Sequence, residues 1–217
     1  MLVEIGACIV SYLAMELICG IYSYVRNKFK SNGYENLDWI RKPDEGYVPN
    51  DLDNQLIEKS KAIIGRHFPT GIEESLADME IDQRMDTLKE LCENISELYG
   101  IRVDAIKFEP GENIGTNICG LYDFQNKRIV INVDMLASDN PQILRDTVDT
   151  VIHECRHGLQ YTAITTSDYP LATDLQKKSW ANNYTNYIRP EVDPRFYYLQ
   201  EMEFDARNFA QAVLSNF

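Results

Sequence analysis

The N-terminus of the chain is an almost unbroken apolar segment. Residues 2–25 are mainly apolar over about the length that crosses a bilayer, and the basic sequence RNKFK follows at once. This pattern predicts that residues 1–30 form a hydrophobic helix that anchors the chain on the cytoplasmic face of a membrane. Glu4 and Glu16 lie inside the segment, where a carboxylate costs about 2–3 kcal/mol. A helix that packs on the domain or on a second copy, in a cytoplasmic protein, is the alternative.

The pattern beyond this segment changes first to a linker and then to helices. Residues 31–50 are rich in Gly, Pro, Asn and Asp without a hydrophobic period, so we expect a linker that lies on the surface, held by Trp39. Helical spacing predicts one helix over residues 51–64 and a longer one over residues 73–99, ended by Gly100. Residues 51–217 are expected to form a single domain.

Short β-like segments follow these helices. They cover residues 101–110, 112–124 and 127–136, and turns separate them. In the last segment Ile129 and Ile131 alternate with less apolar positions, as in a half-buried strand. We expect a small antiparallel or mixed sheet, and hence an α+β fold.

A capped amphipathic helix comes next. Asn140 is expected as its N-cap and Pro141 as its first residue. Apolar residues then recur every three or four positions and form one stripe, at Leu144, Val148, Val151, Ile152, Cys155 and Leu159. His153 and His157 fall together on nearly the opposite side of the helix.

Charge and cysteine usage narrow the range of functions. The net charge is −13, which repels a phosphate backbone and argues against a nucleic-acid partner. The five cysteines are scattered, without a CxxC pair, so neither a disulfide framework nor a thiolate zinc site is expected. A reducing compartment fits this pattern.

The sequence His153-Glu-x-x-His157 carries the main chemical signal. Histidines four residues apart on a helix can bind one ion, and neutral imidazole is a common zinc ligand. Glu154 projects to the side, where it can act on a water as a general base. The competing interpretation is an ordinary polar helix face. Arg156 is interpreted as a structural salt-bridge partner.

A catalytic zinc needs a third protein ligand and an open position. The segment PRFYYLQEMEFDARNFAQAVL is predicted to be helical, and Glu203 lies on the edge of its apolar stripe beside small residues. An inward-facing carboxylate calls for a partner such as a metal. Glu203 is therefore the favoured ligand. Glu201, with Asp205 as its supporting residue, is the alternative.

These motifs resemble those of the gluzincin class of zinc metallopeptidases. Within that class the chain looks most like small bacterial and phage-associated regulatory or toxin-like peptidases, on the basis of HECRH, residues 203–210 and the turn 120–122 ahead of the strand RIVINV. The resemblance covers residues 101–217. It implies a zincin-like fold with an edge strand, an HExxH helix and a later glutamate-bearing helix.

The expected function is zinc-dependent cleavage of a peptide bond in a protein or peptide substrate. Zn²⁺ on His153, His157 and Glu203 would activate a water and Glu154 would move its proton, with Tyr161 and Tyr197 as candidate oxyanion donors. The strand RIVINV is expected to offer its edge to the substrate. Residues 162–194 are expected to cover the cleft. A catalytically inactive, zinc-stabilised interaction or sensor module tethered to the membrane, and a hydrolase of non-peptide amides, stay open as alternatives.

Overall fold

The computed structural model describes residues 39–42, 45–116 and 118–217. The predicted N-terminal helix lies outside these residues. No helix within the described ranges has the length and apolar character that crossing a membrane requires. The described residues divide into two compact units, one with residues up to 48 and 179–204 and the other with residues 49–178 and 205–217.

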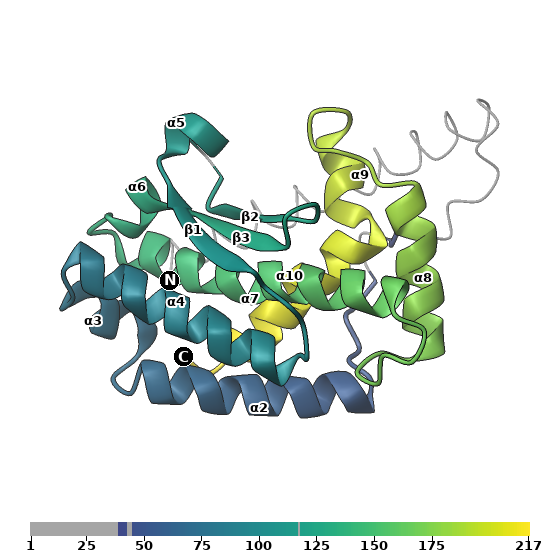
Figure 1. Ribbon diagram of the computed structural model, residues 1–217, viewed down its shortest axis with the longest axis horizontal. Coiled ribbons are helices and arrows are strands. Elements are labelled where there is room, and N and C mark those ends of the chain that lie inside the picture. The colour runs from purple at the N-terminus through teal and green to yellow at the C-terminus, as the bar shows by residue number, and fades with distance from the viewer. Residues whose placement is uncertain (1–38, 43–44, 117) are drawn as a thin grey trace, which may run out of the picture. The chain divides into compact units, whose positions relative to one another are not determined.

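The larger unit is a mixed α/β assembly around one core. Figure 1 shows its small sheet on one side of helices α4 and α7, with helix α2 on the other side of α4. Its described elements are α2 (Asp51–His67), α3 (Ile72–Ala77), α4 (Ile81–Leu98), β1 (Ala105–Glu109), α5 (Gly111–Ile114), β2 (Gly120–Asp123), β3 (Arg128–Asn132), α6 (Val133–Leu136), α7 (Pro141–Thr165), the start of α8 (Asp174–Thr185) and most of α10 (Glu201–Leu214). The predicted α+β class is confirmed.

Helix α2 appears where a helix was predicted, but the predicted long helix 73–99 is wrong. This region forms two helices, α3 and α4, and a capping box of Glu80 and Gln83 marks the start of α4. The guanidinium of Arg84 donates to the carbonyls of Leu76 and Met79 at 2.8 and 3.1 Å. These bonds tie the start of α4 to the backbone at and after the end of α3. Gly100 does follow α4 with φ of 59°, which favours glycine.

The sheet is mixed, as expected, in the order β1-β3-β2. β1 pairs with β3 in parallel and β2 pairs with β3 antiparallel. The expectation that RIVINV supplies an edge strand is therefore wrong, because β3 is the central strand. Its residues Ile129, Val130 and Ile131 are all buried, so both of its faces pack against protein.

Helix α7 begins as predicted, with the Asn140 side chain accepting from the Gln142 amide and Pro141 in the first turn. Every residue of its predicted apolar stripe is fully buried. Within the same unit, the Arg156 guanidinium lies 4.3 Å from the ring centroid of Phe209 on α10. The Tyr99 ring packs edge-on against the same phenyl ring, with centroids 5.9 Å apart. The core of this unit therefore joins α4, α7 and α10.

The smaller unit contains the rest of α8, helix α9 (Pro194–Leu199) and the first residues of α10. One helical segment was predicted from α9 to α10, but the helix is broken at Gln200. Gln200 is extended and bridges Ile40, while the Glu201 amide donates to the Trp39 carbonyl at 2.8 Å. Trp39 is buried, in accord with its expected anchoring role.

Candidate metal centre

The two histidines of α7 direct nitrogen atoms toward one point. Their Nε2 atoms are 3.0 Å apart. Two nitrogen ligands of a tetrahedral zinc, each about 2.0–2.1 Å from the ion, lie about 3.3 Å from one another. His157 is buried and His153 is half-buried, so the pair is accessible from one side. The pair therefore has the spacing of two ligands of one ion.

A carboxylate completes a group that could hold a metal ion. One ligand atom from each of His153, His157 and Glu203 lies within 4.8 Å of the other two. Two imidazoles and one carboxylate form a donor set typical of catalytic zinc sites. Glu203 lies in the first turn of α10, and this helix continues into the larger unit from Asp205.

Gln160 determines which nitrogen of His157 is free to bind a metal. The Nδ1 atom of His157 lies 2.8 Å from Oε1 of Gln160, three residues later on α7. The Gln160 side-chain nitrogen in turn donates to Asp205 at 2.8 Å. This bond orients the Gln160 side-chain oxygen toward the imidazole. Nδ1 therefore carries the proton and Nε2 keeps its lone pair. This is the tautomer that a metal bound at Nε2 requires.

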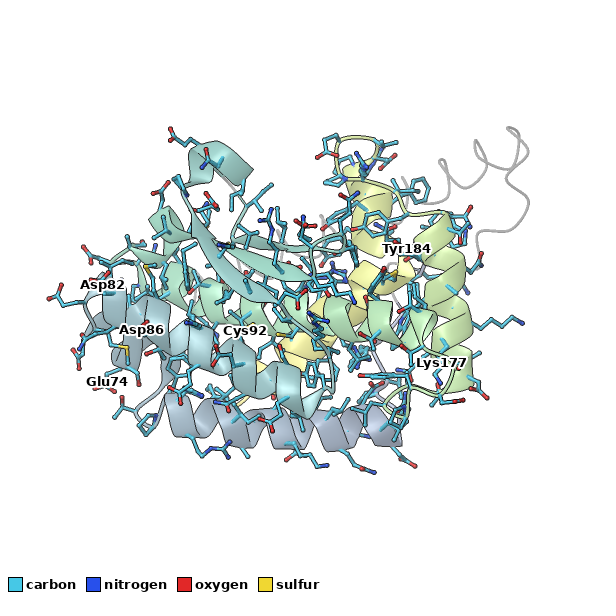
Figure 2. The ribbon with its side chains drawn as sticks, viewed as in Figure 1. Glu74, Asp82, Asp86, Cys92, Lys177 and Tyr184 are labelled. Carbon is cyan, nitrogen blue, oxygen red and sulfur yellow. The ribbon has the colours of Figure 1, made fainter. Side chains whose placement is uncertain are left out.

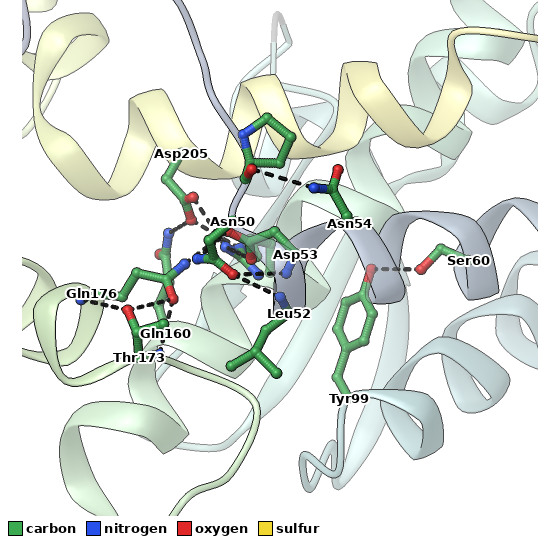
Figure 3. A network of polar contacts seen from close by, with 12 residues as sticks. Asn50, Leu52, Asp53, Asn54, Ser60, Tyr99, Gln160, Thr173, Gln176 and Asp205 are labelled. Atoms are coloured by element: carbon green, nitrogen blue, oxygen red, sulfur yellow. Dashed lines mark hydrogen bonds and ion pairs between the residues drawn. The ribbon is translucent and has the colours of Figure 1, made fainter.

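A buried polar chain extends from Gln160 to helix α2 (Figure 3). The Arg156 guanidinium donates two hydrogen bonds to Asp205, of 2.8 and 3.0 Å, and one of 2.7 Å to Asp53 on α2. The Asp53 carboxylate also accepts from Gln176 and Asn50, each at 2.9 Å. The Arg156 side chain is 0% exposed, so its role as a structural ion-pair partner is confirmed.

Glu201 and Glu203 have different partners. Arg41 donates two hydrogen bonds to the two carboxylate oxygens of Glu201. The bond with Glu201 raises the pKa of Arg41. Asp205, the supporting residue in the alternative assignment, pairs with Arg156 and Gln160. The metal-competent group contains Glu203, while Glu201 already has a cationic partner.

Tyr187 was not predicted, yet its hydroxyl donates to the Glu203 carboxylate. The residue lies in the segment 162–194. The Tyr197 ring packs at right angles against Tyr187, with centroids 6.2 Å apart. Tyr197, a predicted oxyanion donor, is thus adjacent to a tyrosine that contacts a candidate ligand. Tyr198, its neighbour, is half exposed.

Strand β2 and the turn after it lie along α7 beside the histidines. Gly120 lies so close to Thr150 that a Cβ atom added to Gly120 would be 2.8 Å from the threonine methyl. At the other end, the Phe124 ring lies 6.4 Å from the His157 ring and 5.6 Å from the Tyr161 ring. Tyr161, the other predicted oxyanion donor, therefore lies near His157 with Phe124 against its ring.

Glu154, the predicted general base, is buried on α7 directly after His153. One turn before that histidine, burial raises the pKa of the Asp149 carboxyl. Asp149 was not predicted, although it precedes His153 by four residues on one helix. The same rule indicates Gln160, three residues after His157. No local signal indicates Asp53 or Tyr187.

Comparison with known proteins adds no family assignment. No family model, no curated protein and no solved structure matches this chain. What can be stated of the site is therefore its own chemistry: His153, His157 and Glu203 could hold a metal ion within an α+β fold.

Proposed function

We propose that the chain is a zinc-dependent endopeptidase that hydrolyses a peptide bond through a metal-activated water. The observation that carries the proposal is the grouping of His153, His157 and Glu203 within 4.8 Å, with Glu154 between the two histidines in sequence. Two imidazoles and a carboxylate leave a coordination position open, as catalytic zinc sites do. The resemblance of these motifs to those of gluzincin metallopeptidases supports the same function.

Zinc at these ligands would supply a Lewis acid that activates water and polarises the substrate carbonyl. The residues of the chain supply the remaining steps. The Gln160 side chain holds the His157 proton on Nδ1, 2.8 Å away. Glu154 takes a proton from the attacking water and delivers it to the leaving amine. Tyr161 and Tyr197 are the proposed donors to the developing oxyanion.

A peptide substrate is favoured by the edge strand beside the site. In the described sheet β1 and β2 are both edge strands, each paired only with β3, and β2 is the edge that approaches α7 at Thr150. β2 and the turn after it lie close to α7 between Thr150 and His157. An extended substrate segment that paired with β2 would therefore pass near the histidines. The role first assigned to RIVINV thus passes to residues 120–123.

The acidic surface favours neutral or basic substrate segments. The net charge is −13, and Glu74, Asp82 and Asp86 extend outward from α3 and α4 in Figure 2. Acidic segments would be repelled, and the preference should weaken as salt is added. Substrate preference should therefore depend on ionic strength.

The test compares zinc content and proteolysis in matched variants. Wild type and Glu154→Gln should both retain zinc, while only wild type should cleave a degenerate peptide library read by mass spectrometry. His153→Ala should lose both zinc and cleavage. Cleavage that survives in Glu154→Gln would contradict the mechanism. Zinc binding without cleavage in wild type would instead favour an inactive, zinc-stabilised interaction module.

A further inference from the structure

Two buried cysteines face each other between α4 and α7. The Sγ atoms of Cys92 and Cys155 lie 4.0 Å apart, and both residues are free thiols. A disulfide requires an S–S distance of about 2.05 Å, so the sulfurs would have to approach by about 2 Å. Rotation about side-chain bonds with small shifts of the two helices can supply such a movement. The pair is therefore placed for cross-linking.

A serine hydroxyl adjoins both sulfurs of the pair. Ser96, one turn after Cys92 on α4, has its Oγ 3.9 Å from the Cys92 sulfur and 3.8 Å from the Cys155 sulfur.

A pocket of about 640 Å³ has Cys92 in its lining. It lies between α4 and the segment that leads into β1, and its lining includes Cys92 and Ser96. Cys155 is not among the lining residues and is fully buried. Figure 2 labels Cys92 on α4, where this helix passes the sheet. A small solute in the pocket would therefore meet Cys92 before Cys155.

We propose that Cys92 and Cys155 form a modification site that a small hydroperoxide converts to a disulfide joining α4 to α7. In the first step the Cys92 sulfur attacks the outer peroxide oxygen. An S–O bond forms, the O–O bond breaks, and the alcohol or water leaves with the thiol proton. In the second step the Cys155 sulfur attacks the Cys92 sulfur. The S–S bond forms and hydroxide leaves as water with the Cys155 proton. Two thiols lose two electrons, and the peroxide gains them.

The cross-link would act on the helix that carries the histidines. Cys155 lies between His153 and His157 on α7, so a covalent bond to α4 restrains this part of the helix. The chemistry of the pair needs neither zinc nor a substrate. The inference therefore goes beyond the proposed peptidase function and does not depend on it.

Peptide mapping of the full-length protein tests the proposal. Reduced protein is treated with hydrogen peroxide, unfolded in iodoacetamide and digested with trypsin. The peptides 90–102 and 146–156, which contain Cys92 and Cys155, should appear as one disulfide-linked species, with parallel loss of both alkylated forms. Dithiothreitol should restore them. The peptide with half-buried Cys119, whose sulfur contacts the Met135 thioether, serves as an internal reference.

Single variants separate the two steps. Cys92→Ser should abolish the linked species, and Cys155→Ser should leave a sulfenic acid on Cys92 that dimedone traps. The proposal is overturned if both thiols stay fully alkylatable at peroxide levels that oxidise Cys119. It is also overturned if Cys92 proceeds to sulfinic acid in wild type without forming the link. Neither result bears on zinc binding or proteolysis.

Discussion

Gln160 accepts a hydrogen bond from His157, with 2.8 Å between Oε1 and Nδ1. This bond connects a candidate metal ligand to the buried chain of Asp205, Arg156 and Asp53. Hydrogen-bond partners of this kind fix the orientation of a ligand and raise its basicity. The buried polar network therefore orients a residue of the candidate metal centre and also joins α2, α7 and α10.

Replacing Gln160 by methionine should weaken zinc binding by about 10–100-fold, because the volume is kept and the acceptor is lost. The measurement is competition for zinc with a chelator of known affinity. Gln142→Met, at an exposed position of the same helix, is the matched control and should bind like wild type. Equal affinity in both variants would show that His157 is oriented by other contacts.

Arg156→Met should lower the free energy of unfolding by about 3–5 kcal/mol, because it leaves two buried carboxylates without their cation. Adding Asp53→Asn and Asp205→Asn should recover part of this loss, since neutral amides are cheaper to bury. Urea denaturation measures both effects. The control Arg102→Met breaks an exposed pair with Asp104 and should cost no more than about 1 kcal/mol. A small effect of Arg156→Met would mean that the chain of ion pairs contributes little to stability.

Tyr187→Phe removes the hydroxyl that donates to Glu203, so zinc affinity should fall by about tenfold. Tyr197→Phe, on the ring beside it, should retain zinc and lose cleavage if Tyr197 stabilises the oxyanion. Chelator competition and peptide cleavage, measured on both variants, separate the two roles. Unchanged zinc affinity in Tyr187→Phe would assign that tyrosine to packing alone.

His67 should make stability depend on pH. Burial lowers the pKa of His67 from 6.5, and the Asn94 side chain lies 3.1 Å from its Nε2 as donor to the neutral ring. Because the folded state favours the neutral form, this stabilisation is complete above pH 6.5 and is lost as pH falls through the lowered pKa. The urea concentration at the unfolding midpoint should fall between about pH 8 and pH 5 in wild type. It should fall less in His67→Gln. Identical pH profiles would remove His67 as the cause.

Local signals in the sequence predicted the part of the fold that carries the histidines. Asn140 and Pro141 mark the start of α7 because their effect depends only on neighbouring backbone amides. The spacing of His153 and His157 on one helix face follows from helix geometry alone. Glu203 was favoured over Glu201 by its place on the edge of an apolar stripe, and metal binding by these residues stays a prediction.

Features that depend on distant partners could not be predicted in the same way. The break at Gln200 results from pairing with Ile40, far away in sequence. Asp53 joins the polar chain through Arg156, 103 residues later. The sequence held a weak local indication that β3 is the central strand. Val130 is apolar and lies on the face where a half-buried edge strand would carry a polar residue. Tertiary contacts, and not local propensity, decide such features.

The most direct test of the central claim is the zinc content of the purified full-length protein by elemental analysis, with Glu203→Ala and Glu201→Ala measured beside wild type. Wild type and Glu201→Ala should each carry about one zinc per chain, and Glu203→Ala should carry almost none. Wild-type protein that purifies without metal and takes up none would contradict the claim and leave His153, Glu154 and His157 as a polar face of α7.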